Sequence, residues 1–136
     1  MDNTNLEIVS PERLLLARPV QMVVIPAWEG EMGVLPGHAP AIVMLRGGTV
    51  RLYEAGQVTD RLYVAGGFAE ITPERCTVLA NEAIPVSELS RAEAEERLQQ
   101  AQAAYDATDR LDIAALDAAM ARIQSARAMV EAAQAG

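Results

Sequence analysis

The chain changes composition abruptly near residue 86, and this change limits what it can fold into. Eight of the nine glycines and all seven prolines lie within the first 85 residues. From residue 88 onward there are sixteen alanines, no proline, and a glycine only at the last position. Alanine is the best helix former, whereas glycine and proline are the worst. We therefore predict a β domain over residues 1–86 and an α domain over residues 87–136.

Apolar and polar residues alternate in the first part, which indicates strands. The stretch "LEIV" places Leu6 and Ile8 on one face, and "TVRLYE" does the same with Val50 and Leu52. Turn signals at "EAGQ" and "ITPE" separate further strands. Gly66 and Gly67 in "RLYVAGGFAEI" mark a bulge or bend, so this stretch supplies one strand or two. Many short strands at this spacing predict an antiparallel sandwich or barrel.

The second part has the pattern of two amphipathic helices. Ser90 followed by Glu93 forms a capping box at the start of the first helix, and Asp109 or Asp112 can cap the second. The first apolar stripe is Ala94, Leu98, Ala101 and Tyr105, and the second is Ile113, Leu116, Met120, Ile123 and Val130. Two helices with a short link pack antiparallel. The predicted fold class is α+β, an antiparallel β-sandwich followed by an antiparallel two-helix hairpin.

Charge and hydropathy exclude several classes of function. The net charge is −8, and all eleven basic residues are arginine, without basic clusters. Such a chain is a poor ligand for nucleic acid or anionic lipid. The longest apolar run falls far short of the roughly 20 residues that a membrane-spanning helix needs. With no secretory signal and a single cysteine, we expect a soluble, cytoplasmic chain without direct membrane insertion.

The stretch "GEMGVLPGHAP" contains the only histidine, His38. A general base needs an orienting partner and a metal ion needs several ligands, and the sequence offers neither pattern around His38. Cys76 alternates with polar residues in a strand pattern and is predicted to be a buried small hydrophobe. We predict no catalytic residue and no metal site, which leaves an enzyme that uses His38 as the most distant alternative.

Three stretches in order, "EGEMGVLPGHAP", "VAGGFAEI" and "RAEAEERL", resemble the epsilon subunit of bacterial F-type ATP synthases, the counterpart of the mitochondrial delta subunit. The resemblance covers nearly the whole chain. It implies a non-catalytic central-stalk subunit of the rotor that binds the gamma subunit and the ring of c subunits and so couples proton flow to ATP synthesis. It also implies a peripheral position at the cytoplasmic face of the bacterial inner membrane.

The same resemblance assigns roles to the "GEMGVLPGHAP" loop. Glu31 and His38 are implied to contact the c-ring. The residues expected to shape this partner-interface loop are Gly30, Gly33, Pro36, Gly37 and Pro40. Prolines reduce the entropy that a loop loses when it docks. We therefore interpret the loop as a surface shaped for a partner.

In relatives, the hairpin can also meet the catalytic alpha and beta subunits and block ATP hydrolysis, helped by basic side chains. Residues 88–136 carry nine acidic residues and five arginines here, a net charge of −4. Attraction to an acidic partner is therefore weak. We predict weak or absent inhibition by this hairpin.

Some relatives bind ATP in the hairpin through an I/L-D-x-x-R-A motif. The matching stretch here has serine and glutamate in the first two places, so half of the motif is changed. The residues that could still hold a nucleotide are Glu88, Arg91, Arg122 and Arg127. No other cofactor is predicted.

The main rival interpretation is a free-standing adaptor protein that uses its hairpin to recruit an unrelated partner. Alanine-rich stripes are compatible with both, because small faces can pack on each other or on a partner helix. The two interpretations differ in where the protein is found. A rotor subunit travels with membranes, whereas an adaptor stays in the soluble fraction.

Overall fold

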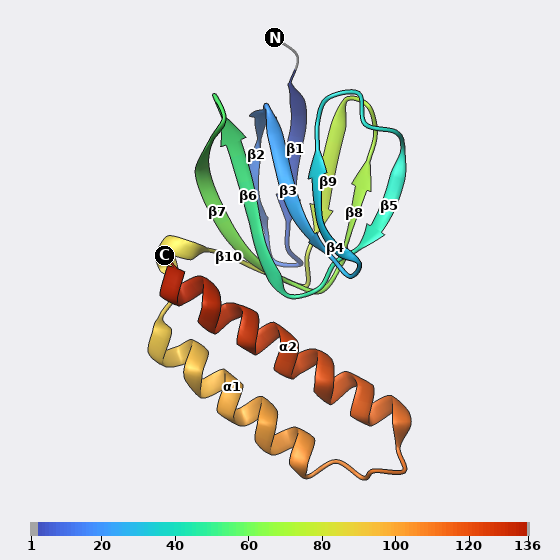
Figure 1. Ribbon diagram of the computed structural model, residues 1–136, viewed down its shortest axis with the longest axis vertical. Coiled ribbons are helices and arrows are strands. Elements are labelled where there is room, and N and C mark those ends of the chain that lie inside the picture. Colours follow the sequence, from blue (N-terminus) through green and yellow to red (C-terminus); the bar gives the residue numbers. More distant parts are fainter. Residues whose placement is uncertain (1–2, 136) are drawn as a thin grey trace.

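The computed structural model describes residues 3–135 and shows a β-sandwich with two helices beyond one end (Figure 1). The two sheets lie face to face, and the helices run side by side across that end. Strands come first in the chain and the helical hairpin second. The predicted α+β fold class is confirmed.

Within the described residues, ten strands form two five-stranded sheets. The first sheet has the order β2-β1-β9-β8-β5, with strands Leu14–Val20, Thr4–Val9, Arg75–Leu79, Phe68–Ile71 and Ala41–Met44. The second sheet has the order β10-β7-β6-β3-β4, with strands Glu82–Pro85, Gln57–Ala65, Gly48–Glu54, Met22–Ala27 and Gly30–Val34.

One pair of neighbouring strands departs from the predicted antiparallel pattern. β1 and β9 run parallel, from Asn5 opposite Arg75 to Val9 opposite Leu79. The other neighbours in both sheets are antiparallel. Parallel neighbours need a long crossover, and the chain here passes through both sheets before it returns beside β1. Residue alternation carries no information on the direction of a partner strand, so it could not indicate this pair.

The core lies between the sheets and consists of the alternating apolar side chains. Leu6 and Ile8 of β1 are fully buried, and so are Val50 and Leu52 of β6, which confirms both alternation patterns. Cys76 is fully buried among them as a small hydrophobe, as predicted. Burying a valine, leucine or isoleucine side chain contributes about 1.5–3 kcal/mol relative to exposure. This core therefore holds the two sheets together and so positions the residues on their surface.

The predicted turns are also confirmed. β6 and β7 are joined at Ala55 and Gly56, both with positive φ, as a tight hairpin requires. Thr72 and Arg75 close the turn between β8 and β9, with the Thr72 N–H 2.8 Å from the Arg75 oxygen. At Gly67, between β7 and β8, a Cβ would overlap the carbonyl oxygen of Leu79, so the bend requires glycine.

A short 3-10 helix, η1 (Val86–Glu88), leads from β10 to α1 (Arg91–Asp106), and α2 spans Ile113–Ala135. The two helices pack along each other in antiparallel directions (Figure 1). They contact the sandwich mainly through α2, which lies against β6 and β7.

The helix caps follow the sequence in part. The Ser90 side chain accepts the Glu93 N–H at 3.2 Å, which is one half of the predicted capping box. The reverse bond from the Ser90 N–H to the Glu93 carboxylate is absent from the described residues. The Asp112 carboxylate accepts the Ala115 N–H at 3.0 Å, so Asp112 is the cap of α2.

The predicted apolar stripe of α2 is wrong in part. Ile113 and Met120, which it places in the interface, are 66% and 55% exposed. The buried side chains of α2 are Ala119, Ala126, Met129 and Ala132. Helix axes approach closely where side chains are small, so the alanines take the inner face. The stripe of α1 is confirmed at Ala94 and Ala101, which are buried.

Candidate partner-binding surface

The sequence suggested that the stretch from Gly30 to Pro40 is a single loop, but the structure divides it into a strand and a connection. Its first five residues, Gly30–Val34, form strand β4 and pair with β3, so Gly30 and Gly33 lie in a sheet. Only residues 35–40 form a connection, which leads to β5. The β3–β4 turn lies at the end of the sandwich next to the helices, and the β4–β5 connection crosses the opposite end (Figure 1).

The β4–β5 connection is held to the sandwich by its backbone. The Gly37 N–H donates to the Pro73 oxygen at 2.7 Å, and the His38 N–H donates to the Leu35 oxygen at 3.2 Å. Gly37 has a φ of +81°, a conformation that favours glycine. Pro36 precedes it with a fixed φ. These backbone hydrogen bonds and Pro36 therefore restrain the connection up to His38.

His38 is partly exposed in this connection. Its Nδ1 lies 2.7 Å from the oxygen of Ala39, its own neighbour in the chain. Pro40 follows and leads into β5.

Glu31 lies at the other end of β4. Its carboxylate accepts two hydrogen bonds from Arg51 of β6, at 2.6 and 3.4 Å, and its side chain remains 56% exposed. The hydrogen bond to Glu31, and next the one with Tyr53, raises the pKa of Arg51 above its ordinary value. The structure thus separates Glu31 and His38, which the sequence treats as one contact surface.

An exposed apolar patch borders this region, and the sequence analysis missed it. The patch consists of Trp28, Ile42 and Met44, which are 52%, 72% and 59% exposed. The Trp28 N–H donates to the Met44 oxygen at 3.1 Å, which joins the β3–β4 turn to β5. In "AIVM", both strand faces are apolar, so alternation could not tell which one faces water. The one sequence signal for an exposed apolar patch was that all four residues of this strand are apolar.

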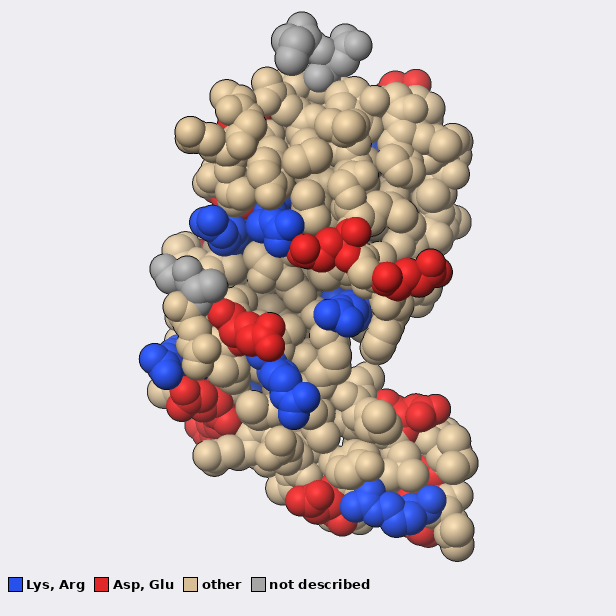
Figure 2. Space-filling view, in the orientation of Figure 1, with Lys and Arg blue, Asp and Glu red and all other residues tan. Residues whose placement is uncertain are grey.

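Charged side chains are unevenly distributed over the surface. On the face seen in Figure 2 they gather where the sandwich meets the hairpin and on the hairpin itself, while most of the sandwich face carries none. An uncharged face beside an exposed apolar patch is typical of a protein-binding surface.

The hairpin is fastened to the sandwich by three polar contacts. Gln124 of α2 forms two bonds with the backbone of Gly47, accepting its N–H at 2.9 Å and donating to its oxygen at 2.7 Å. The buried Tyr63 hydroxyl donates to the Ser125 oxygen at 2.8 Å. Burial raises the pKa of Tyr63 to about 12, because water no longer solvates the phenolate.

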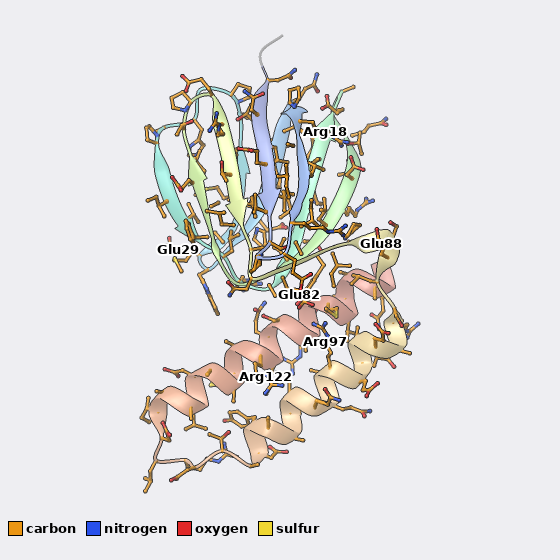
Figure 3. The ribbon with its side chains drawn as sticks, turned by 180° about the vertical axis from the view of Figure 1, so that it is seen from behind. Arg18, Glu29, Glu82, Glu88, Arg97 and Arg122 are labelled. Atoms are coloured by element: carbon orange, nitrogen blue, oxygen red, sulfur yellow. The ribbon has the colours of Figure 1, made fainter. Side chains whose placement is uncertain are left out.

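The third contact is a bidentate ion pair. Arg97 of α1 donates two bonds of 2.7 Å to Glu82 of β10, and Figure 3 shows the two side chains pointing toward each other. This hydrogen bonding raises the pKa of Arg97 above its ordinary value. A paired geometry of this kind is the strongest that arginine forms with a carboxylate.

The four candidate nucleotide-binding residues are not brought together. Arg122 lines a cleft of about 490 Å³ with Arg97, whereas Arg127 lines a separate one on the other side of α2. Glu88 lies in η1, where β10 leads into the hairpin (Figure 3). Arg91 is paired with Glu95 at 3.2 Å. Nucleotide binding by this set stays a prediction.

Metal and membrane features can be stated for residues 3–135. They contain no group of three or more histidine, cysteine, aspartate or glutamate side chains placed to hold a metal ion. None of their helices combines the length and the apolar character that crossing a membrane requires.

The chain was compared with known proteins. The model of the ATP synthase Delta/Epsilon chain beta-sandwich domain matches residues 3–86. The ATP synthase epsilon chain of Granulibacter bethesdensis is 73% identical, over 98% of this chain and 99% of that protein. The epsilon chain of Gluconacetobacter diazotrophicus is 50% identical, over 93% of this chain and 90% of its own length.

Two solved structures have the same architecture. A chain in the OSCP/F1/c-ring structure of the Euglena gracilis mitochondrial ATP synthase matches with a TM-score of 0.79 and 25% identity, covering 97% of this chain and 82% of that one. A chain in the central stalk/c-ring structure of the Tetrahymena thermophila enzyme matches with a TM-score of 0.62 at 14% identity, over 96% of each chain, and shows the fold alone. Because the domain model covers more than half of the chain and the relatives cover nearly all of it, the chain belongs to the ATP synthase epsilon-chain family.

Proposed function

We propose that this chain is a non-catalytic rotor subunit that joins the gamma subunit to the c-ring and couples proton flow to ATP synthesis. The observation that carries the proposal is the exposed apolar patch of Trp28, Ile42 and Met44 on a rigid sandwich. Family membership and the likeness to a chain in an OSCP/F1/c-ring structure support it. The proposed location is peripheral, at the cytoplasmic face of the bacterial inner membrane.

Within this proposal, residues 1–86 are the coupling unit and residues 87–136 a regulator. The apolar patch is assigned to gamma, because partner interfaces centre on exposed aromatic and large apolar side chains. The β4–β5 connection and the β3–β4 turn, at the two ends of the sandwich, are the candidates for the c-ring.

The coupling proposal is tested by adding full-length protein to membranes stripped of this subunit and measuring ATP-driven proton pumping. Wild type should restore pumping. Ile42→Glu should fail, because a carboxylate in the apolar patch weakens the gamma contact, while a 72% exposed side chain has little role in folding. Leu111→Glu is the matched control, since Leu111 is 88% exposed on the hairpin. If Ile42→Glu and Leu111→Glu restore proton pumping equally, the apolar patch does not bind gamma.

Residues 1–87 alone can be added to the same membranes. Restored pumping would support a sandwich that couples by itself. Failure of this fragment, with full-length protein active, would mean that the helices are needed for docking. If full-length protein also fails to restore pumping, the coupling function itself is wrong.

Glu31 and His38 lie at opposite ends of the sandwich, and this limits which of them can contact the c-ring. A single flat partner surface can reach only one end of the sandwich, so we expect only one of Glu31→Gln and His38→Gln to disturb pumping. The affected variant identifies the end that faces the c-ring. Arg51→Gln is the control for Glu31, because it removes the same ion pair and leaves the carboxylate in place. Full activity of both variants would place the c-ring contact elsewhere.

We further propose that the hairpin inhibits ATP hydrolysis weakly. Its net charge of −4 over residues 88–136 opposes binding to an acidic partner. Strong inhibition by added full-length protein, lost when the last 24 residues are removed, would contradict this. Nucleotide binding by Glu88, Arg91, Arg122 and Arg127 is a separate proposal, and a calorimetric titration with ATP that releases no heat would refute it.

A further inference from the structure

The hairpin covers only part of the outer face of the second sheet. Along β7, the outward-facing Tyr63 is buried beneath α2, whereas the next two outward-facing side chains, Arg61 and Thr59, are exposed. The helices cross only the nearer end of these strands (Figure 1). The rest of the face on β6 and β7 is open. It belongs to the sheet opposite to the one that contains β5 and its exposed residues Ile42 and Met44.

Two arginines face each other on this open surface. Arg51 of β6 is directly opposite Arg61 of β7 in the antiparallel register. Residues in such positions have Cβ atoms about 4.5–5.5 Å apart, and like charges there destabilise a sheet. The pair therefore lowers the stability of the free protein, and an anionic group between the two guanidinium groups would remove that cost.

The carboxylates beside this pair do not neutralise Arg61. Glu31 forms its ion pair with Arg51. Asp60 precedes Arg61 in the chain, but it forms an ion pair with Arg18 of β2, in the first sheet. Among residues 3–135, no carboxylate lies within 4.0 Å of the Arg61 guanidinium group. An unpaired positive charge thus faces solvent on a chain whose net charge is −8.

Tyr53 and Met22 continue the surface beyond the arginines. They lie opposite each other on β6 and β3, and both are partly exposed. The Tyr53 hydroxyl accepts a hydrogen bond from Nε of Arg51 at 3.4 Å. Tyrosine, methionine and arginine are residue types enriched in protein interfaces. Arg61 and Tyr53 line neither of the two clefts beside α2, so this surface suits a protein partner better than a small molecule.

We propose that this face docks a segment of a partner protein that carries a carboxylate next to an apolar side chain. The carboxylate lies between Arg51 and Arg61, and the apolar side chain packs on Tyr53 and Met22. The free guanidinium group of Arg61 can donate two parallel hydrogen bonds to the carboxylate. Nucleic acid and anionic lipid are disfavoured because the chain as a whole is acidic, whereas one carboxylate meets only the local positive charge.

The test uses full-length protein and a blocked hexapeptide of alternating glutamate and leucine, followed by backbone amide NMR. Saturable shifts are expected at Arg51, Tyr53 and Arg61. The affinity should decrease as salt is added, because salt screens exposed charges. The same peptide with glutamine in place of glutamate should bind at least about tenfold more weakly. This second peptide separates a carboxylate site from a general apolar surface.

Arg61→Gln should raise the Kd for the glutamate peptide about tenfold, the loss of one charge-assisted contact. Arg75→Gln is the matched control, because Arg75 is also an exposed strand arginine without an ion pair among residues 3–135, but it lies on β9 of the first sheet. It should change the Kd less than about twofold.

A second measurement separates binding from a structural role. Arg61→Gln removes the like charge opposite Arg51, so the urea midpoint of the free protein should stay the same or rise. A clear decrease of the midpoint in Arg61→Gln, but not in Arg75→Gln, would show that Arg61 serves the fold and would overturn the proposal.

Equal weakening by Arg61→Gln and Arg75→Gln would also overturn it, since that result indicates non-specific attraction. Equal binding of the two peptides would exclude a carboxylate site. Shifts confined to Ile42 and Met44 would place the peptide on the apolar patch instead, and the absence of saturable binding would leave the face without this partner. None of these results depends on gamma or the c-ring, so the proposed coupling function is tested separately.

Discussion

At the scale of single residues, Gly47 determines how closely the hairpin can approach the sandwich. A Cβ built on Gly47 would lie 2.6 Å from the Ser125 Cα, which is backbone and cannot move aside. Gly47 also exchanges two hydrogen bonds with Gln124. The close packing of α2 on the sandwich and its hydrogen bonds to the sandwich backbone thus both depend on glycine at position 47.

Gly47→Ala should therefore weaken the docking of α2 by about 1–3 kcal/mol, the usual cost of overpacking. Hydrogen exchange of the α2 amides should accelerate while that of the β1 and β9 amides stays unchanged. Gly33→Ala is the control, because its added Cβ would lie 3.8 Å from the nearest atom, the sulfur of Met22, in ordinary contact. Unchanged exchange in α2 for Gly47→Ala would contradict this role.

At the scale of elements, much of the fold could be predicted because its signals are local. The switch in glycine, proline and alanine content separates strands from helices, and alternation at Val50 and Leu52 identifies the buried face of β6. The outer face of β5 could not be predicted, because Ile42 and Val43 are both apolar and only tertiary packing decides which one is inside. The same limit applies to α2, where alanines rather than Met120 are buried.

The candidate site was predicted less completely than the fold. The stretch around Gly33 contains enough glycine and proline to suggest a loop, and pairing with β3 overrides that local preference. Whether a segment is extended decides whether Glu31 and His38 lie together or apart. Sequence spacing alone does not contain that information.

The helix caps allow a prediction at this scale. Ser90→Ala should lower the free energy of unfolding by about 1 kcal/mol, because it removes the acceptor of the Glu93 N–H. The loss should appear as earlier fraying of α1, measured by hydrogen exchange of its first turn. Ser87→Ala is the control, since Ser87 is exposed in η1 outside α1. A similar loss in both variants would mean that the cap has no specific role.

At the scale of the whole molecule, two buried acids should make the protein less stable in alkali. Burial raises the pKa of Cys76 to about 11 and that of Tyr63 to about 12. Both groups are neutral when protonated, and the folded state holds its protons more tightly than the unfolded state does. Their contribution to the free energy of unfolding is complete at neutral pH and decreases as pH rises through these pKa values. The chain has no lysine, so no ammonium group titrates in the same range.

The free energy of unfolding should therefore decrease from about pH 9 upward, by on the order of 2 kcal/mol for the thiol alone. Urea denaturation at a series of pH values measures this. Cys76→Ala should flatten the decrease between about pH 9 and pH 11, whatever its effect on stability at pH 7. A slope identical to that of wild type would show that the thiol is not responsible.

The course of β4 from one end of the sandwich to the other has a mechanical consequence. In the proposed role the sandwich carries torque, and a force applied between the ends of this strand is directed along its backbone. β4 is paired with β3 through five register positions, from Val34 to Gly30, so such a force loads the whole ladder at once rather than one bond after another. We therefore expect β4 to resist a force applied between the two ends of the sandwich, which the proposed coupling role requires.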